Sequence, residues 1–439
     1  MSEQTARLRP LDLVSPRVGI IRSLARVSRG VDEPSPPILY HAQLAHYDFR
    51  RRTGLERGAA GKGLTEEQAV ASAIGEACER YCAHHAGVRP IRRAKRADLD
   101  GAAITPADCV LYADSQYGRT DFPYAPWNAQ TETGWVAGEE RPGGDAVWLP
   151  ASLVYMNYAG DENQDAFTPP TSNGLAAGPD LESAALAGLC ELAERDAFLI
   201  YWMNRLPAVE VQFEGGLAAS IRDHYRRFQT ETRVFHLDTG LPLYVMMAVS
   251  LSADSRAPAA IVGLGCHLDP GAAATRALFE ICQVRPGEVR KYRDDPPTAR
   301  LTAYRDVKTL EDHSAWFTIH EHLGELAFLL DDRGTGRVVK VQDMATFSRG
   351  FVAADLDVVV DGLVRAGCRV GIIDITTPDV GSCGIRVVRT FATGLQPIHF
   401  GFGEERLGGR RLFELPSTLG FGAHHRTEAD LNPCPHPLA

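Results

Sequence analysis

The sequence lacks the segments that carry a chain into or across a membrane. No apolar run is long enough to span a bilayer, and no signal-peptide-like apolar stretch follows the polar start MSEQTARLRP. Basic clusters are missing too, because the 439 residues carry a net charge of −10 and no block of Lys and Arg stands out. This balance argues against nucleic acid or an anionic membrane as a partner. We therefore expect a cytoplasmic globular protein.

Paired cysteines are also missing. The nine cysteines are dispersed and form no C-x-x-C pair, which fits a reducing compartment better than a disulfide framework. Cys78 and Cys82, with His84 and His85 after them, could in principle bind zinc. Two cysteines one helical turn apart are more often packing residues, and we favour that interpretation.

Common nucleotide-binding and hydrolytic motifs do not occur. There is no G-x-S-x-G, no H-E-x-x-H and no G-x-G-x-x-G in a strand-to-helix setting. Lys62 does not belong to a Walker A loop, since Gly63 follows it and Glu56 stands where the first glycine belongs. Glycine-rich turns are nevertheless expected before three helices, at residues 61–63, 173–174 and 263–265. Each turn taken alone is a plain helix entry, although such turns also let backbone amides approach an anion.

The remaining patterns predict a mixed α/β protein. Alternating or β-branched apolar runs predict strands at residues 208–213, 243–251, 259–266 and 368–376, with Ala-rich helices between them. Residues 1–55 are expected to form an N-terminal strand and extension, and residues 90–170 a variable part made of loops and short strands. No linker is clear enough to separate two units, so we expect one composite domain over residues 1–439.

Three predicted helices repeat one pattern. They begin at the N-cap residues Thr65, Asp180 and Asp269, and Gln68 is placed for a capping box with Thr65. Eleven residues after each cap stands a glutamate, three residues later a second acid or amide, and then an arginine. These residues are Glu76, Glu79 and Arg80; Glu191, Glu194 and Arg195; and Glu280, Gln283 and Arg285.

The acid pairs of these helices call for a cation. An i, i+3 spacing puts two carboxylates on one helix face, roughly 5–6 Å apart at Cβ. The helices are otherwise rich in Ala, Leu and Ile, and buried carboxylates are costly unless a positive group meets them. Nearby arginines are one answer and Mg²⁺ with phosphate ligands is the other. A single E-x-x-E-R is usually a solvated helix face, but three copies at one distance from their caps favour a site.

The sequence resembles the YcaO family from about residue 15 onward. The resemblance is carried by four segments, which are GKGLTEEQAVASAIGEACERY, SNGLAAGPDLESAALAGLCELAERDA, GLGCHLDPGAAATRALFEICQVR and IDITTPDVGSCGIRVVRT. It implies a YcaO-type fold with three similar capped helices around an ATP and Mg²⁺ site that has no P-loop. The implied metal ligands are Glu76, Glu79, Glu191 and Glu194. The implied nucleotide-binding residues are Lys62, Ser72, Asn173, Arg80, Arg195, Arg276, Glu280, Gln283 and Arg285.

The last residues, LNPCPHPLA, contain Pro433, Pro435 and Pro437 as P-x-P-x-P. Such an end is usually an extended or disordered tail. Within the family, however, it resembles the mark of azoline-forming cyclodehydratases, which implies catalytic roles for His436, Pro437 and Ala439. We expect removal of the tail to stop the reaction while sparing thermal stability.

The resemblance implies an ATP-dependent enzyme that converts Cys, Ser or Thr of a ribosomally made precursor peptide into thiazoline or oxazoline. Thioamide formation, amidine formation and a non-catalytic docking scaffold remain as alternatives. The implied partners are the precursor peptide and a separate E1-like (ThiF-like) leader-binding protein, since no segment of the sequence resembles that domain. A flavin-dependent azoline dehydrogenase and a homodimer or hetero-complex are further expectations.

Overall fold

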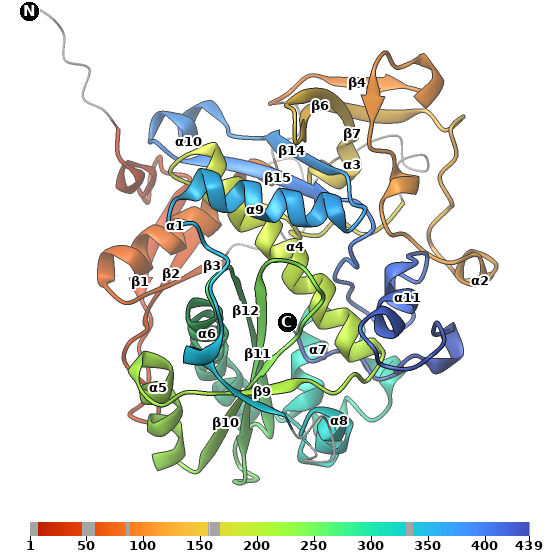
Figure 1. Ribbon diagram of the computed structural model, residues 1–439. Helices are drawn as coiled ribbons and strands as arrows, with labels where there is room; N and C mark the ends of the chain where they lie inside the picture. The colour runs from red at the N-terminus through yellow and green to blue at the C-terminus, as the bar shows by residue number, and fades with distance from the viewer. Residues whose placement is uncertain are drawn as a thin grey trace, which may run out of the picture.

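The computed structural model describes residues 8–45, 58–84, 88–156, 158, 167–330 and 337–438. Three sheets and several helices alternate along these residues, so the predicted mixed α/β class is confirmed. Figure 1 shows the three sheets arranged around the long helix α4 (Leu181–Met203). None of the described helices combines the length and apolar character needed to cross a membrane.

The N-terminal sheet consists of β1 (Ile21–Arg26), β2 (Ile38–Leu44) and β3 (Gly58–Gly63), all antiparallel. Helix α1 (Glu66–Ala83) packs on β2 and β3. Cys78 and Cys82 are fully buried in the core beneath α1, which supports the packing interpretation of this pair. His85 lies outside the described residues.

The second sheet has the order β12 (Ala260–His267), β11 (Tyr244–Ser252), β10 (Thr230–His236), β9 (Val209–Gln212) and β13 (Val338–Lys340). Helices α5 (Gly216–Arg227) and α6 (Pro270–Asp294) cover one of its faces. The strands predicted at residues 208–213, 243–251 and 259–266 correspond to β9, β11 and β12.

The third sheet combines strands from residues 91–178 with strands from residues 370–392. Its order is β5 (Ala102–Ala103), β7 (Asp145–Pro150), β6 (Thr133–Arg141), β14 (Val370–Asp374), β15 (Arg386–Ala392) and β8 (Leu175–Gly178), and β4 (Ile91–Ala94) also pairs with β6. Loops and short strands were expected at residues 90–170. The nine-residue β6 pairs directly with β14, so this region also supplies a central strand. The pairing partner lies far away in sequence, which local patterns do not reveal.

Helix α4 is buried along most of its length. It packs on β8 and β15 of the third sheet, on α9 (Val352–Arg365) and on β12 of the second. Phe198 and Trp202 belong to the largest side chains that are fully enclosed. The remaining helices are short and lie at α2 (Asp114–Tyr117), α3 (Ala151–Val154), α7 (Leu310–Phe317), α8 (Ala327–Leu330), α10 (Pro378–Ser382) and α11 (Arg411–Thr418).

The three similar helices begin as predicted. Thr65, Asp180 and Asp269 each accept a hydrogen bond from the backbone N–H three residues later. The capping box at Thr65 is only half formed. Oε1 of Gln68 accepts a hydrogen bond from the N–H of Leu64 (2.9 Å) and not from the N–H of Thr65. Each helix follows a strand, so the repeated unit is a strand, a cap and a helix.

Glycines let each strand lie against the helix that follows it. Gly61 and Gly265 lie within β3 and β12, whereas the sequence predicted turns there. A Cβ atom on Gly61 would come within 2.1 Å of Ala73 N, and one on Gly265 within 2.2 Å of Ala273 O. Only the turn at residues 173–174 is confirmed, with Gly174 at φ +84°. The glycines therefore serve strand–helix packing.

Candidate active site

The first carboxylate of α1 is fixed by its own strand. Oε2 of Glu76 accepts a hydrogen bond from the N–H of Ala60 in β3 (3.0 Å), and its Oε1 accepts from Nη2 of Arg80 (2.6 Å). Glu79, one turn on, reaches a different unit, since its Oε1 accepts from the N–H of Ala177 in β8 (2.7 Å). Helix α1 thus joins the N-terminal sheet to the third sheet through its two acids.

Helix α6 repeats this arrangement. Oε2 of Glu280 accepts from the N–H of Leu264 in β12 (2.7 Å). The sequence separation between acid and donor is 16 residues in both units, Ala60 to Glu76 and Leu264 to Glu280. The repeat seen in the sequence is therefore also a repeat of hydrogen bonding.

The acids of α4 lie between those of α1 and α6. Arg195 lies 3.9 Å from Glu191 and 3.6 Å from Glu194. The pKa of Glu194 is raised to about 7, mainly by burial, with smaller contributions from the carboxylates of Glu280 and Glu191 that oppose the lowering effect of Arg195. Burial, followed by repulsion from Glu76, also holds the pKa of Glu79 well above its ordinary value. Glu76, Glu79, Glu191, Glu194 and Glu280 form one electrostatically coupled group, called the acid cluster below.

The acid cluster suits a cation that brings other ligands with it. Among the residues that the structure describes, no three His, Cys, Asp or Glu side chains are arranged to hold a metal ion by themselves. Mg²⁺ is usually bound by one or two carboxylates, with phosphate oxygens and waters completing the shell. The buried Glu194 and the half-buried Glu79 and Glu191 all have raised pKa values, which fits that mode.

The predicted nucleotide-binding residues occupy several places around this cluster. Lys62 lies half-buried in β3, and its charge lowers the pKa of Glu194. Asn173 lies in the turn before β8, and its buried Oδ1 has no hydrogen-bond partner. Ser72 is exposed on α1 and Gln283 is half-buried on α6.

Two predicted nucleotide-binding arginines of α6 have partners within the protein. Nη1 of Arg276 donates to the carbonyl of Cys266 (2.8 Å). Arg285 is buried between Tyr225, whose ring lies 5.3 Å from its guanidinium carbon, and the carboxylates of Asp32 and Glu33. Contact between Arg285 and a nucleotide stays a prediction. No sequence pattern links Arg285 to an acidic pair some 250 residues away.

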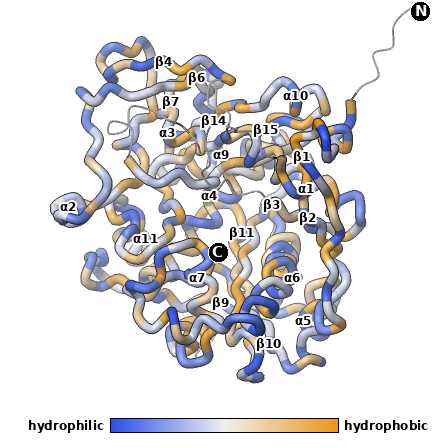
Figure 2. The backbone as a smooth tube through the Cα atoms, turned by 180° about the vertical axis from the view of Figure 1, so that it is seen from behind, coloured by the Kyte–Doolittle hydropathy of each residue, from blue (hydrophilic) through white to orange (hydrophobic). Residues whose placement is uncertain are grey.

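The C-terminal tail is built into the core. The N–H of Asn432 donates to Met203 O (2.6 Å), and Nε1 of Trp202 donates to Cys434 O (2.9 Å). Cys434 and Leu438 are both 3% exposed and belong to the main hydrophobic cluster. Figures 1 and 2 show the C-terminal end in the middle of the molecule, near α7 and β11. A disordered tail is therefore excluded, and we now expect its deletion to destabilise the fold.

His436 is the centre of a buried histidine group. Its ring is 1% exposed, stacks on His313 with 4.1 Å between the ring centres, and packs edge-on against His399. Its Nε2 lies 2.7 Å from His399 O, and its Nδ1 accepts from the N–H of Leu438 (3.3 Å). Burial, followed by the charges of His313 and His399, holds the pKa of His436 well below its ordinary value.

These contacts change the role expected for His436. Both ring nitrogens are used inside the protein, so the geometry supports an anchor for the tail and not a proton acceptor. The residues around the tail, Phe198, Trp202, His313 and His399, are called the tail seat below. His313 carried no sequence signal, and the sequence patterns did not point to His399 either.

The tail continues toward the acid cluster. Pro437 and Leu438 line a pocket together with Glu280 and Glu288 of α6. The charge of Arg195 also lowers the pKa of His436, which places the two regions within electrostatic reach. Ala439 lies outside the described residues, so its catalytic role stays a prediction.

Comparison with known proteins accounts for this arrangement. The model of a family described as YcaO cyclodehydratase, ATP- and Mg²⁺-binding, matches residues 60–396. The chain belongs to the YcaO family. A curated relative from Methanothermobacter thermautotrophicus, described only as an uncharacterized protein, is 31% identical over 359 residues, which cover 80% of this chain and 84% of the relative.

Solved structures agree with the family and the fold. A heterocyclase in complex with substrate and cofactor is 28% identical and superposes with a TM-score of 0.81 over 99% of this YcaO chain. That match covers 58% of the heterocyclase, so the chain spans little more than half of its length. The fold is shared as well with YcaO from Methanopyrus kandleri, solved with AMPPCP and Mg²⁺, at 23% identity and a TM-score of 0.62 over 86% of each chain.

Proposed function

We propose that this YcaO protein is an ATP-dependent cyclodehydratase that forms azolines in a peptide substrate. Family membership supports ATP and Mg²⁺ as its requirements, and the heterocyclase likeness supports a peptide as the molecule acted on. The single observation that carries azoline formation is the seat of the tail. The P-x-P-x-P segment is held in the core, and its last described residues line a pocket with Glu280.

The reaction needs an activated amide oxygen. A Cys, Ser or Thr side chain attacks the carbonyl carbon of the preceding amide, and the oxygen of that adduct takes the γ-phosphoryl group of ATP. Loss of phosphate then leaves the C=N bond of the five-membered ring. Overall, one water is removed from the peptide, and ATP becomes ADP and phosphate. Phosphorylation is needed because an amide oxygen is a poor leaving group.

The side chains of the site would divide this work. Glu76, Glu79, Glu191 and Glu194 would hold Mg²⁺ against the nucleotide phosphates, and bound Mg²⁺ would neutralise charge on the transferring group. Glu280 completes the acidic surface from α6. Arg195 has a buried Nη1 without a hydrogen-bond partner, and together with Lys62 and Arg80 it supplies positive charge for phosphate oxygens.

The tail would close the site on the peptide side. A proline-rich segment loses little conformational entropy when it is held in a groove. His436 fixes this segment through both ring nitrogens, and Pro437 is thereby kept beside Glu280. With His436 engaged, the end of the tail at Ala439 is the remaining candidate for accepting the proton of the attacking thiol or hydroxyl.

Mass spectrometry of a treated precursor peptide tests the proposal. Azoline formation removes one water per ring, whereas thioamide formation exchanges oxygen for sulfur and amidine formation joins an amine to the amide carbon. ATP hydrolysis without any change in the peptide would reject azoline formation and would indicate that the protein catalyses a different ATP-dependent reaction. A protein that neither hydrolyses ATP nor changes the peptide, even with its partners present, would be a docking scaffold.

The expected partners belong to the same proposal. We propose that a separate E1-like (ThiF-like) protein holds the leader of the precursor peptide and raises its effective concentration at this site. Adding that protein should increase the rate at low peptide concentration much more than at saturation. A flavin-dependent dehydrogenase would act afterwards on the rings.

A further inference from the structure

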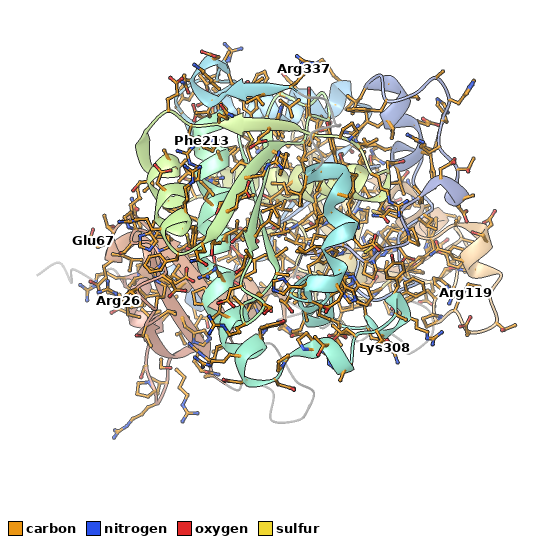
Figure 3. The ribbon with its side chains drawn as sticks, turned by 90° about the horizontal axis from the view of Figure 1, so that it is seen from below. Arg26, Glu67, Arg119, Phe213, Lys308 and Arg337 are labelled. Atoms are coloured by element: carbon orange, nitrogen blue, oxygen red, sulfur yellow. The ribbon has the colours of Figure 1, made fainter. Side chains whose placement is uncertain are left out.

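A second cavity lies beside α4. The space in it that is open to the centre of a water-sized sphere is about 90 Å³, and its walls are mainly apolar residues of three segments, 109–111, 168–171 and 389–397. Leu192 of α4 forms part of its wall, directly after Glu191 of the acid cluster. We call this second cavity the arginine cavity. Arg119, which Figure 3 shows on the side of the molecule away from Arg26 and Glu67, donates to the carbonyl of Gly403 (3.3 Å), three residues before Arg406 of the cavity wall.

Two buried arginines line it, Arg389 of β15 and Arg406, which are 6% and 4% exposed. Arg389 uses Nε and Nη2 to bind the carbonyls of Leu153 and Thr171 (2.9 and 2.8 Å), and its buried Nη1 has no partner. Arg406 binds Oγ1 of Thr168 through Nη2 (2.5 Å), lies over the Tyr112 ring, and leaves its buried Nε without a partner.

Neither arginine has a carboxylate in direct contact among the described residues. Burying a guanidinium without an anion is costly, so such groups are normally paired. Glu191 acts on Arg389 and Glu404 on Arg406 through their charges, but neither forms a hydrogen bond with its arginine. Two buried cations with a free N–H each are therefore prepared for an anion that enters the cavity.

Unpaired acceptors line the same cavity. Gln396 is 1% exposed, and its amide nitrogen donates to Arg406 O (2.8 Å), which fixes its buried Oε1 as an acceptor without a partner. Oδ1 of Asn173 and Oγ of Ser152 are also buried and unpartnered. A ligand that satisfies this wall must donate N–H groups and also carry a negative charge.

We propose that the arginine cavity binds a carboxylate of the peptide substrate together with the neighbouring backbone amides. This inference rests on the proposed function and names a feature of its substrate, an acidic side chain or a free C-terminal carboxylate near the modified residue. Peptide N–H groups suit Oε1 of Gln396, and the apolar lining suits side chains next to the acid. Glu191 and Glu404 already offset part of the positive charge, which favours a monoanion over a dianion such as phosphate.

A set of short synthetic peptides of one sequence tests this, each with a single cysteine and a fluorescent label. One version carries a glutamate and an amidated C-terminus, the second a glutamine and a free C-terminus, and the third a glutamine and an amidated C-terminus. Binding to the ATP-loaded full-length protein is measured by anisotropy. One acidic version should bind about tenfold more tightly than the neutral one, as expected for a charge-assisted hydrogen bond.

The variant Arg406→Gln then completes a double-mutant cycle. The advantage of the acidic peptide should disappear in this variant, because the two changes remove the same contact. Equal binding of all three peptides to the wild-type protein, or an undiminished advantage in the variant, would overturn the inference. The inference would also be overturned if inorganic phosphate displaced the acidic peptide at lower concentrations than acetate does.

This test is independent of catalysis. Peptide binding that depends on the carboxylate, with no ring formed even when a complete precursor and its leader-binding protein are supplied, would leave the cavity assignment standing and would reject azoline formation. Ring formation with no carboxylate preference would do the reverse. The peptide versions are compared on the wild-type protein first, so a folding defect in the variant cannot decide the result.

Discussion

The acid cluster and the tail seat lie within electrostatic reach of each other and are built in opposite ways. The carboxylates of the acid cluster repel one another, and Arg195 leaves a buried N–H unused. At the tail seat, His436 uses both ring nitrogens, Trp202 donates to the tail carbonyl of Cys434, and the tail N–H of Asn432 donates to Met203 O. The acid cluster is short of positive charge, whereas most polar groups at the tail seat have hydrogen-bond partners, with the buried Nδ1 of His399 as an exception.

The difference separates two tasks within one site. A group of buried charges without partners lowers the stability of the free protein. Binding of a ligand of opposite charge restores that stability. A satisfied network keeps one conformation and stabilises the protein with or without ligand. We infer that the acid cluster binds and the tail seat positions, so substitutions in the two regions should have different signatures.

Among the predicted effects, the largest is the loss of ATP-dependent turnover in Glu194→Gln. This substitution should not lower the stability of the protein. Its carboxylate is buried with a pKa raised to about 7 by burial, so its charge is unfavourable in the free protein. Removing that charge should lower ATP-dependent turnover about 10²–10³-fold, as expected when one electrostatic contact to the transferring group is lost. The melting temperature in EDTA should stay the same or rise.

Glu182→Gln is the matched control, because Glu182 lies exposed in the first turn of the same helix. It should leave turnover near the wild-type value. Wild-type turnover by Glu194→Gln at saturating Mg²⁺ would remove the metal assignment, and a large drop in its melting temperature would show that Glu194 is structural.

Leu438→Ala should act mainly on stability. Leu438 is 3% exposed, belongs to the main hydrophobic cluster and lines the pocket with Glu280. We expect a loss of about 2 kcal/mol in the free energy of unfolding, the low end for such a truncation because a chain end can relax. Denaturant unfolding measures it, with Leu181→Ala on exposed α4 surface as the control. Equal effects of the two variants would show that the tail contributes nothing to the core.

The sequence revealed the acid cluster far better than the tail seat, and the reason is physical. Acid spacing, N-caps and helix length are local, so three copies of one pattern predicted α1, α4 and α6 together with most of the acids. The glycines of β3 and β12 were mistaken for turns because close strand–helix approach and turn formation select the same residue. From the local sequence, a glycine in a turn cannot be distinguished from a glycine that allows a strand to pack closely on a helix.

Long-range partners could not be predicted. His313, His399 and His436 come from three distant segments, and nothing in their spacing indicates that two of the rings stack. The pairing of β6 with β14 and the contact of Arg285 with Glu33 join residues more than 200 positions apart. Family resemblance pointed to the tail, but only the three-dimensional contacts distinguish an anchor from a base.

His436→Gln distinguishes those two roles. Gln can still donate to His399 O but does not replace the Nδ1 acceptor for Leu438 N–H, so we expect about 1–2 kcal/mol of destabilisation. If His436 is an anchor, the rate of ring formation at saturating peptide should fall less than about tenfold, whereas loss of a general base costs about 10²–10⁴-fold. His320→Gln is the control for the substitution itself, since that half-buried ring also contacts a backbone carbonyl. A hundredfold loss with unchanged stability would restore His436 as the base.

The smallest effect should appear in the pH dependence of stability, where the two regions have opposite signs. For Glu194, the folded pKa of about 7 lies above the ordinary 4.5, so its contribution is present below pH 4.5 and is lost as pH rises through 7. For His436 and His399, burial lowers the pKa below 6.5, so their contribution is present above pH 6.5 and is lost on acidification. The two trends partly cancel in the wild-type protein between these values. In Glu194→Gln the contribution of Glu194 is removed, while Glu79 and Glu191 keep their raised pKa values. The stability of this variant relative to the wild-type protein should therefore increase with pH, by on the order of 1 kcal/mol between about pH 5 and pH 7. Melting temperatures of both proteins in EDTA, without nucleotide, measure this difference. Parallel curves would show that Glu194 does not carry the raised pKa, and the contrast between an unsatisfied and a satisfied region would fail at that residue.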